Sequence, residues 1–204
     1  RLFPDPISCE AKSLLEGFPK YTNFGTEPIL RSLLAALGES LYESDWQEVL
    51  HRHRASLPNM LKVVGDAYGH ALQFLDEATG ASSGKVVPYS LHLVLLTEFF
   101  RLAPDPGDPA KRELKRWLWA TAFATSYTSG GNLRFNDAVE RARRLAAGEQ
   151  VELLDERPRI RPLPRRFHPK SARVRAFHLF LKQLGPRDPA TGELLTGMLD
   201  NGMA

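Results

Sequence analysis

The residues of this sequence with the clearest chemistry are arginines and lysines gathered in one segment. Between Glu156 and Arg187 the chain carries ten basic side chains and a single acid, which gives this segment a charge of +9. The formal net charge of the whole chain is +3, so the other residues together carry −6. Arginine forms paired hydrogen bonds with phosphate, and cations along a nucleic acid release its counterions. Charge segregated in this way predicts a localised anionic partner.

This basic segment is expected to begin as an extended arm. Four prolines interrupt it, and a proline inside a helix removes a hydrogen bond and clashes with the preceding turn. Arginines spaced along an extended segment can follow the phosphate backbone of a DNA duplex. We therefore assign nucleic-acid binding to eight side chains, called the arm cations from here on: Arg157, Arg159, Arg161, Arg165, Arg166, Lys170, Arg173 and Arg175.

Two alternatives for the arm remain open at this stage. The arm could be a surface linker whose arginines pair with the acidic remainder of the same protein. It could also dock on an acidic partner domain without touching DNA, which would make the chain a protein-interaction scaffold.

Other residues with catalytic chemistry are few. His51 and His53 are two apart in an expected helix, so their side chains point to different faces and do not easily share a metal. His168 could touch a phosphate or activate a water, but no cluster of carboxylates lies near it in the sequence. Asp137 lies near a helix start, where a structural acid is favoured by the helix dipole. The sequence indicates no catalytic residue, no metal site and no cofactor.

The composition is that of an ordinary globular domain, with 43% hydrophobic and 25% charged residues. Cys9 is the single cysteine, so no internal disulfide can form and a reducing cytoplasm is expected. No apolar run approaches the roughly 20 residues that span a bilayer, and we expect no membrane partner. A chain that begins at Arg1 is compatible with a fragment of a longer protein.

The spacing of apolar residues predicts an all-α fold, an irregular bundle of about seven or eight helices. Residues 110 to 148 are expected to form two helices joined by a Gly-Gly turn at the centre of the domain, the second capped by Asn136. Trp117 and Trp119 point to different sides of the first helix, so it is expected to be covered on more than one face. They could stack on bases, but a core position is the more usual role of such tryptophans.

Other helices are expected on both sides of this hairpin. Their ranges are 8–18, 26–38, 44–57 with a capping box at Ser44 and Gln47, 57–75 after a break at Pro58, 88–100, and a last helix from Ser171 to Leu184. Residues 151–154 could form a short strand. We divide the chain into a helical domain (1–150), the basic Pro-rich arm (151–170), and a closing helix with a C-terminal turn on the same domain (171–204).

Three motifs resemble one protein family. The first is Arg116-Trp117-Leu118-Trp119, followed by Tyr127 and Asp137; the second is the sequence KVVPYS at 85–90, where Val87 replaces the usual leucine. The third joins SARVRA at 171–176 to RDPATGE at 187–193. Their order and spacing are similar to the helical region of GmrSD-type proteins, bacterial anti-phage nucleases grouped under a domain of unknown function, and the likeness runs from about residue 26 to 195.

The resemblance implies a helical scaffold inside a larger restriction protein. Family members carry a ParB-like nucleotide-hydrolysing domain before this region and often a nuclease domain after it. Neither catalytic motif is present in this sequence, so no catalytic residue can be carried over. What the resemblance implies for this chain is a non-catalytic module of a modification-dependent DNA restriction protein, with the flanking catalytic domains and duplex DNA as partners.

Overall fold

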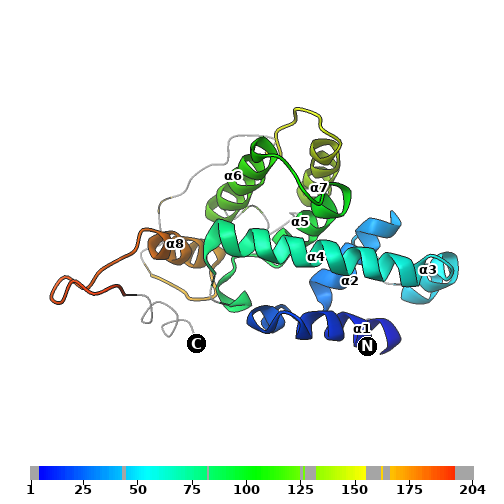
Figure 1. Cartoon of the computed structure of the whole chain (residues 1–204), viewed down its shortest axis with the longest axis horizontal. Coiled ribbons are helices and arrows are strands. Elements are labelled where there is room, and N and C mark those ends of the chain that lie inside the picture. The colour runs from blue at the N-terminus through cyan, green and yellow to red at the C-terminus, as the bar shows by residue number, and fades with distance from the viewer. Residues whose placement is uncertain are drawn as a thin grey trace.

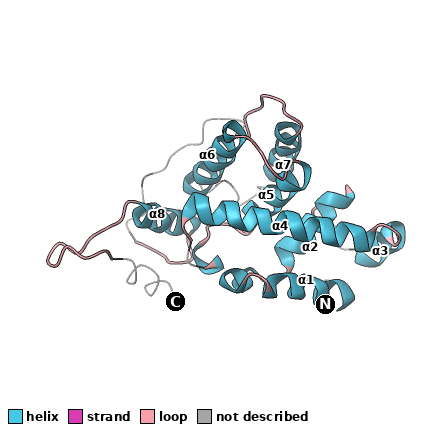
Figure 2. Ribbon diagram, viewed as in Figure 1, coloured by secondary structure: helices cyan, strands magenta, loops and turns pink. Residues whose placement is uncertain are grey.

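The computed structural model describes residues 5–42, 45–81, 83–124, 126, 132–154, 162 and 166–195. This part of the chain is all-helical, which confirms the predicted fold class (Figures 1 and 2). The elements are α1 (Asp5–Glu16), η1 (Pro19–Phe24), α2 (Glu27–Leu37), α3 (Trp46–His53), α4 (Leu57–Thr79), η2 (Gly84–Val86), α5 (Leu91–Leu102), α6 (Asp108–Ala124), α7 (Asn132–Ala146) and α8 (Ala172–Gln183).

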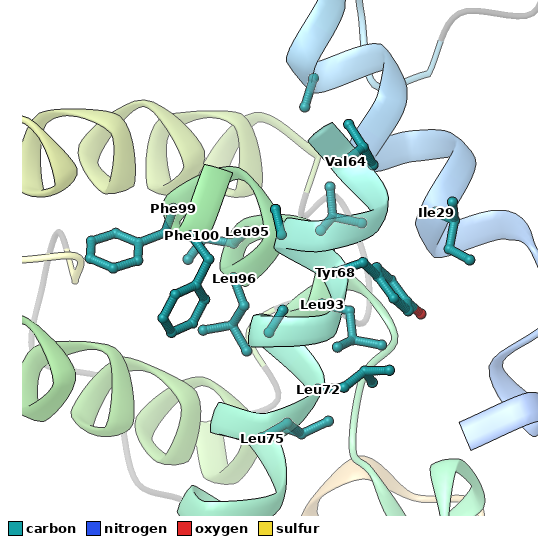
Figure 3. Close-up of a cluster of buried hydrophobic side chains, with 14 of the residues drawn as sticks. Ile29, Val64, Tyr68, Leu72, Leu75, Leu93, Leu95, Leu96, Phe99 and Phe100 are labelled. Atoms are coloured by element: carbon teal, nitrogen blue, oxygen red, sulfur yellow. The ribbon is translucent and has the colours of Figure 1, made fainter. Parts of the chain in front are cut away.

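The centre of the bundle is the pair α4 and α5. α5 is buried over most of its length, with every residue from His92 to Phe100 at most 4% exposed. It packs against α2, α4 and α7, and Figure 3 shows Leu93 of α5 beside Tyr68 and Leu72 of α4. The prediction that the α6–α7 hairpin forms the centre was wrong, because α6 packs chiefly on α8 and α7 on α5.

The long helix α4 follows the sequence pattern closely. Its predicted apolar stripe is buried throughout, from Leu61 and Val64 to Leu72 and Leu75. The helix begins at Leu57, where a break was predicted, and Pro58 occupies its first turn. Proline lacks an N–H group, and the first turn of a helix has no partner for that group, so Pro58 starts α4 without losing a hydrogen bond.

Two predicted helix starts differ from the structure. α3 is capped by Asp45, whose Oδ1 accepts a hydrogen bond from the Glu48 amide at 3.1 Å, while Ser44 lies outside the described residues. α7 begins at Asn132, so Asn136 is not a cap but an exposed residue within the helix. Burial of Phe135 next to Ala138 and Val139 extends the inner face of α7 by one turn, and this packing outweighs the capping preference of asparagine.

Residues 151–154 form no strand, which corrects that prediction. In the described residues the only pairing of extended backbone is an isolated antiparallel bridge between Arg187 and Leu194. The turn between them is held by Asp188, whose Oδ1 accepts hydrogen bonds from the amides of Ala190 and Thr191 at 2.7 and 3.1 Å. Gly185, two residues after the end of α8, has a positive φ of 61°.

One charged group lies within the core. The side chain of Glu98 on α5 is fully buried and accepts hydrogen bonds from Arg101 at 2.8 and 2.9 Å and from Nε of Arg143 at 2.7 Å. Arg143 belongs to α7, and its Nη2 also donates to the carbonyl oxygen of Ala35 on α2 at 2.9 Å. These contacts satisfy the buried carboxylate and join α5, α7 and α2.

Replacing Glu98 with alanine should destabilise the protein strongly. The substitution leaves two guanidinium groups without the carboxylate they face, and breaking a buried ion pair costs about 3–5 kcal/mol. The measurement is the free energy of unfolding in urea. Glu140→Ala is the matched control, because it removes an exposed carboxylate that pairs with the same Arg143 at 3.1 Å and should cost less than about 1 kcal/mol. Equal losses in the two variants would contradict a structural role for the buried pair.

Candidate nucleic-acid interface

The structure divides the arm cations into three groups. Four of them, Arg157, Arg159, Arg161 and Arg165, lie outside the described residues. Arg166 and Lys170 are exposed immediately before α8. Arg173 and Arg175 lie in the first turn of α8 and are partly buried.

Arg173 connects the arm to the end of α6. Its Nε donates to the carbonyl oxygen of Phe123 at 3.1 Å, and its Nη1 donates to the carbonyl oxygen of Pro162 at 3.0 Å. These two bonds orient the guanidinium group between the end of α6 and Pro162.

Arg175 has a similar role on the other side of α8. Its Nη1 donates to the carbonyl oxygen of Val87 at 3.2 Å and its Nε to that of Pro169 at 3.3 Å. Desolvation lowers the pKa of this guanidinium, although arginine remains charged in proteins. Arg175 therefore holds the entry to α8 against the loop before α5, a positioning role that the sequence did not indicate.

α8 presents a basic and aromatic outer surface. Its sequence, ARVRAFHLFLKQ, contains no acid. Ala172, Val174, Ala176 and Leu179 are buried on its inner side, where the helix packs on α6 and α4. The last helix was predicted to run to Leu184, but α8 ends at Gln183, and Leu184, which follows the last turn, is 66% exposed.

Aromatic side chains gather on the surface that α6 and α8 share. Trp119 stacks on Phe123 with ring centroids 6.0 Å apart, and Phe180 of α8 stands edge-on to both, at 6.4 and 6.3 Å. Phe167, just before α8, contacts Phe177 at 6.1 Å. The sequence did not indicate this cluster, because its residues come from three separate segments.

Trp117 and Trp119 lie on different sides of α6, as predicted from their spacing. Trp117 is fully buried and lies 5.0 Å from the ring of His92, whereas Trp119 is partly exposed. Trp117 is therefore a core residue, and Trp119 is the tryptophan that a ligand at this surface could reach.

Several carboxylates of the bundle pair with cations outside the arm. Glu98 binds Arg101 and Arg143 as described above, and Glu113 pairs with Arg116 at 2.7 Å. Glu39 accepts hydrogen bonds from His53 at 2.7 Å and from Arg52 at 2.6 Å, and the His53 bond is the main reason that its pKa is lowered. These acids have their positive partners within the bundle.

The remaining candidates from the sequence are dispersed. His51 is exposed on α3, and His53 points instead to Glu39. His168 is exposed, and its Nδ1 accepts a 3.3 Å hydrogen bond from the Lys170 amide. Asp137 is exposed on α7. Across the described residues, no three His, Cys, Asp or Glu side chains lie close enough together to hold a metal ion.

A cavity of about 210 Å³ lies between α2 and α5, lined by Glu27, Arg31, Tyr42 and Ser90 among others. Arg31 pairs with Glu27 at 2.6 Å, and its guanidinium covers the Tyr42 ring at 4.9 Å from the centroid. The charged groups of the cavity thus satisfy each other, and the surface of α6 and α8 is the stronger candidate for a binding site.

His92 is the titratable group with the most perturbed environment. It is completely buried between α5 and α6, and its Nε2 lies 3.0 Å from Oγ1 of Thr121. Thr121 itself donates to the carbonyl oxygen of Trp117 at 2.8 Å, so its oxygen accepts from His92. Burial lowers the pKa of His92 to about 3, which makes it a neutral residue that joins two helices.

Comparison of the chain with protein-family models, curated proteins and solved structures finds no match. Among the described helices, none has both the length and the apolar character needed to cross a membrane.

The buried imidazole of His92 should make stability fall as the solution becomes acidic. The unfolded chain takes up a proton near pH 6.5, whereas the folded protein does so only near pH 3. The free energy of unfolding should therefore decrease as the pH falls below about 6.5, by up to about 1.4 kcal/mol per pH unit from this residue. Urea unfolding between pH 7 and pH 4 measures this slope.

His92→Gln should be less stable at pH 7 but should show a shallower loss on acidification. His51→Gln, which removes an exposed histidine, should keep the slope of the native protein. An unchanged slope in His92→Gln would show that His92 is not the group responsible.

Proposed function

We propose that this chain is a non-catalytic helical module that contacts the backbone of duplex DNA through the arm cations and the outer surface of α8. The supporting observations are two exposed cations and one oriented arginine beside α8. Arg166 and Lys170 are exposed to solvent, and Arg175 is oriented by the carbonyl oxygens of Val87 and Pro169. Arginine and lysine side chains at such positions can contact phosphate.

The resemblance to GmrSD-type proteins leads us to propose a wider setting for this module. In that setting it is part of a modification-dependent DNA restriction protein that acts in phage defence in the bacterial cytoplasm. Flanking catalytic domains of the parent protein would supply nucleotide hydrolysis and DNA cleavage. This chain would position those domains and add affinity for the DNA backbone.

The exposed apolar side chains near α8 favour a second candidate function, a protein-interaction scaffold. Phe167, Phe180, Leu184 and Leu194 are each at least 43% exposed, and contiguous apolar surface often marks a protein interface. On this proposal the arm docks on an acidic partner domain. Charge reversal at Arg165 and Arg166 would weaken the association of the domains and leave DNA affinity unchanged.

Salt dependence separates the two functions. The affinity for a duplex of about 20 base pairs, measured by fluorescence anisotropy, should fall by about 0.9 log units per log unit of salt for each phosphate neutralised. The double variant Arg166→Gln/Lys170→Gln should bind more weakly and show a slope smaller by up to about 1.8.

The matched control is Arg54→Gln/Lys62→Gln, which removes the same charge from exposed positions near the start of α4, in the half of the bundle away from α8 (Figure 1). It should leave the slope unchanged. Binding that does not depend on salt, or equal effects of the two double variants, would rule out duplex contact through the arm.

A further inference from the structure

Five aromatic side chains lie on α6, on α8 and in the segment just before α8. We call this group the aromatic strip, and its members are Trp119, Phe123, Phe167, Phe177 and Phe180. The rings of Trp119, Phe123 and Phe180 contact one another, and those of Phe167 and Phe177 form a second contact. Phe177 and Phe180 are three residues apart on α8, which places the two groups at neighbouring positions of one helix.

The strip lies on the surface instead of filling the core. Phe167 is 56% exposed and Phe180 is 43% exposed, whereas the core aromatics Trp117 and Phe135 are fully buried. A phenylalanine that is left in water forgoes the gain of burial, about 1.5–3 kcal/mol for a whole side chain. Two such exposed rings beside three partly buried ones therefore point to a ligand with flat or apolar groups.

Positively charged side chains lie near the members of the aromatic strip in the sequence. Arg166 and Lys170 flank Phe167 in the sequence, and both are exposed. Lys115 is exposed on α6 four residues before Trp119, which puts the two side chains on the same face of that helix. Arg173 lies four residues before Phe177 on α8, a helix that contains no acid.

The combination of flat rings and cations favours one class of ligand. Lysine is depleted from the cores of protein–protein interfaces, so a purely protein partner does not account for these basic side chains. A DNA duplex offers phosphates, but its bases are stacked inside the helix and cannot meet the rings. Unpaired nucleotides offer both groups, because every base has a face that stacks on an aromatic ring.

We propose that the aromatic strip binds single-stranded nucleic acid, with bases stacked on Phe167 and Phe180 and phosphates placed against Arg166 and Lys170. The inference rests on the proposed contact with nucleic acid and adds a preference for unpaired strands. Trp119 stacks directly on Phe123 and contacts Phe180, so its fluorescence reports on occupancy of the strip.

The first test compares strands of one sequence in two forms. A labelled single strand of about 12 nucleotides, within the site sizes of about 4 to 16 seen for single-strand binding, and its duplex are titrated with the full chain by fluorescence anisotropy. Phe167→Leu and Phe180→Leu should each weaken single-strand binding by about 10-fold and change duplex binding by less than about 2-fold. Leu184→Ala removes an exposed apolar side chain without a ring and should change neither.

The second test uses intrinsic fluorescence. Trp46 and Trp117 are buried, so quenching by an added single strand should come from Trp119 and should be lost in Trp119→Phe. Far-ultraviolet circular dichroism confirms that each variant keeps its helices.

The outcomes separate this inference from the proposed function. If the phenylalanine variants bind both forms as the native chain does, while Arg166→Gln/Lys170→Gln weakens both, duplex contact stands and stacking is overturned. If Leu184→Ala weakens binding as much as the ring variants, general apolar contact replaces stacking. If neither form binds at low salt, both proposals fail, and the strip is left as a surface for a protein partner.

Discussion

The arrangement of the helices depends on the hydrogen-bond partners of one buried carboxylate on the apolar helix α5. α5 is enclosed by α2, α4 and α7, and Glu98 is its one buried acid. A charge removed from water is tolerated only with partners close by, and Arg101 and Arg143 provide them. Arg143 also reaches the Ala35 carbonyl, so the same requirement fixes α7 and α2 relative to α5. The relative positions of α2, α5 and α7 are therefore set by this polar cluster as well as by the packing of apolar side chains.

The pairing of acids with cations inside the bundle is relevant to the charge on its surface. Glu98, Glu113 and Glu39 bind arginines and a histidine that belong to the bundle. At the closing helix, Arg166 and Lys170 are exposed, and Arg175 is oriented by the carbonyl oxygens of Val87 and Pro169. The positive edge next to α8 is thus part of the folded architecture, which is the physical basis for proposing an anionic partner at this edge.

Local patterns in the sequence predicted the parts of the fold that depend on neighbouring residues. The apolar stripe of α4, its start at Leu57 and the different environments of Trp117 and Trp119 all follow from helical periodicity and proline geometry. Features decided by contacts between distant segments were missed. The centre of the bundle, the start of α7 before Asn136 and the meeting of Phe180 with Trp119 all required tertiary packing. The same holds for Arg175, whose carbonyl partner at Val87 is far away in the chain.

The two hydrogen bonds of Arg173 also bear on the thermodynamics of recognition. By hydrogen-bonding the carbonyl oxygen of Pro162, this side chain fixes one described point of the arm next to the end of α6. A segment whose course is already restricted loses less conformational entropy when it meets a ligand. Because Arg173 already holds Pro162 next to α6, less of the chain has to be ordered when a ligand binds there. A smaller part of the affinity gained from charge is then lost to conformational entropy.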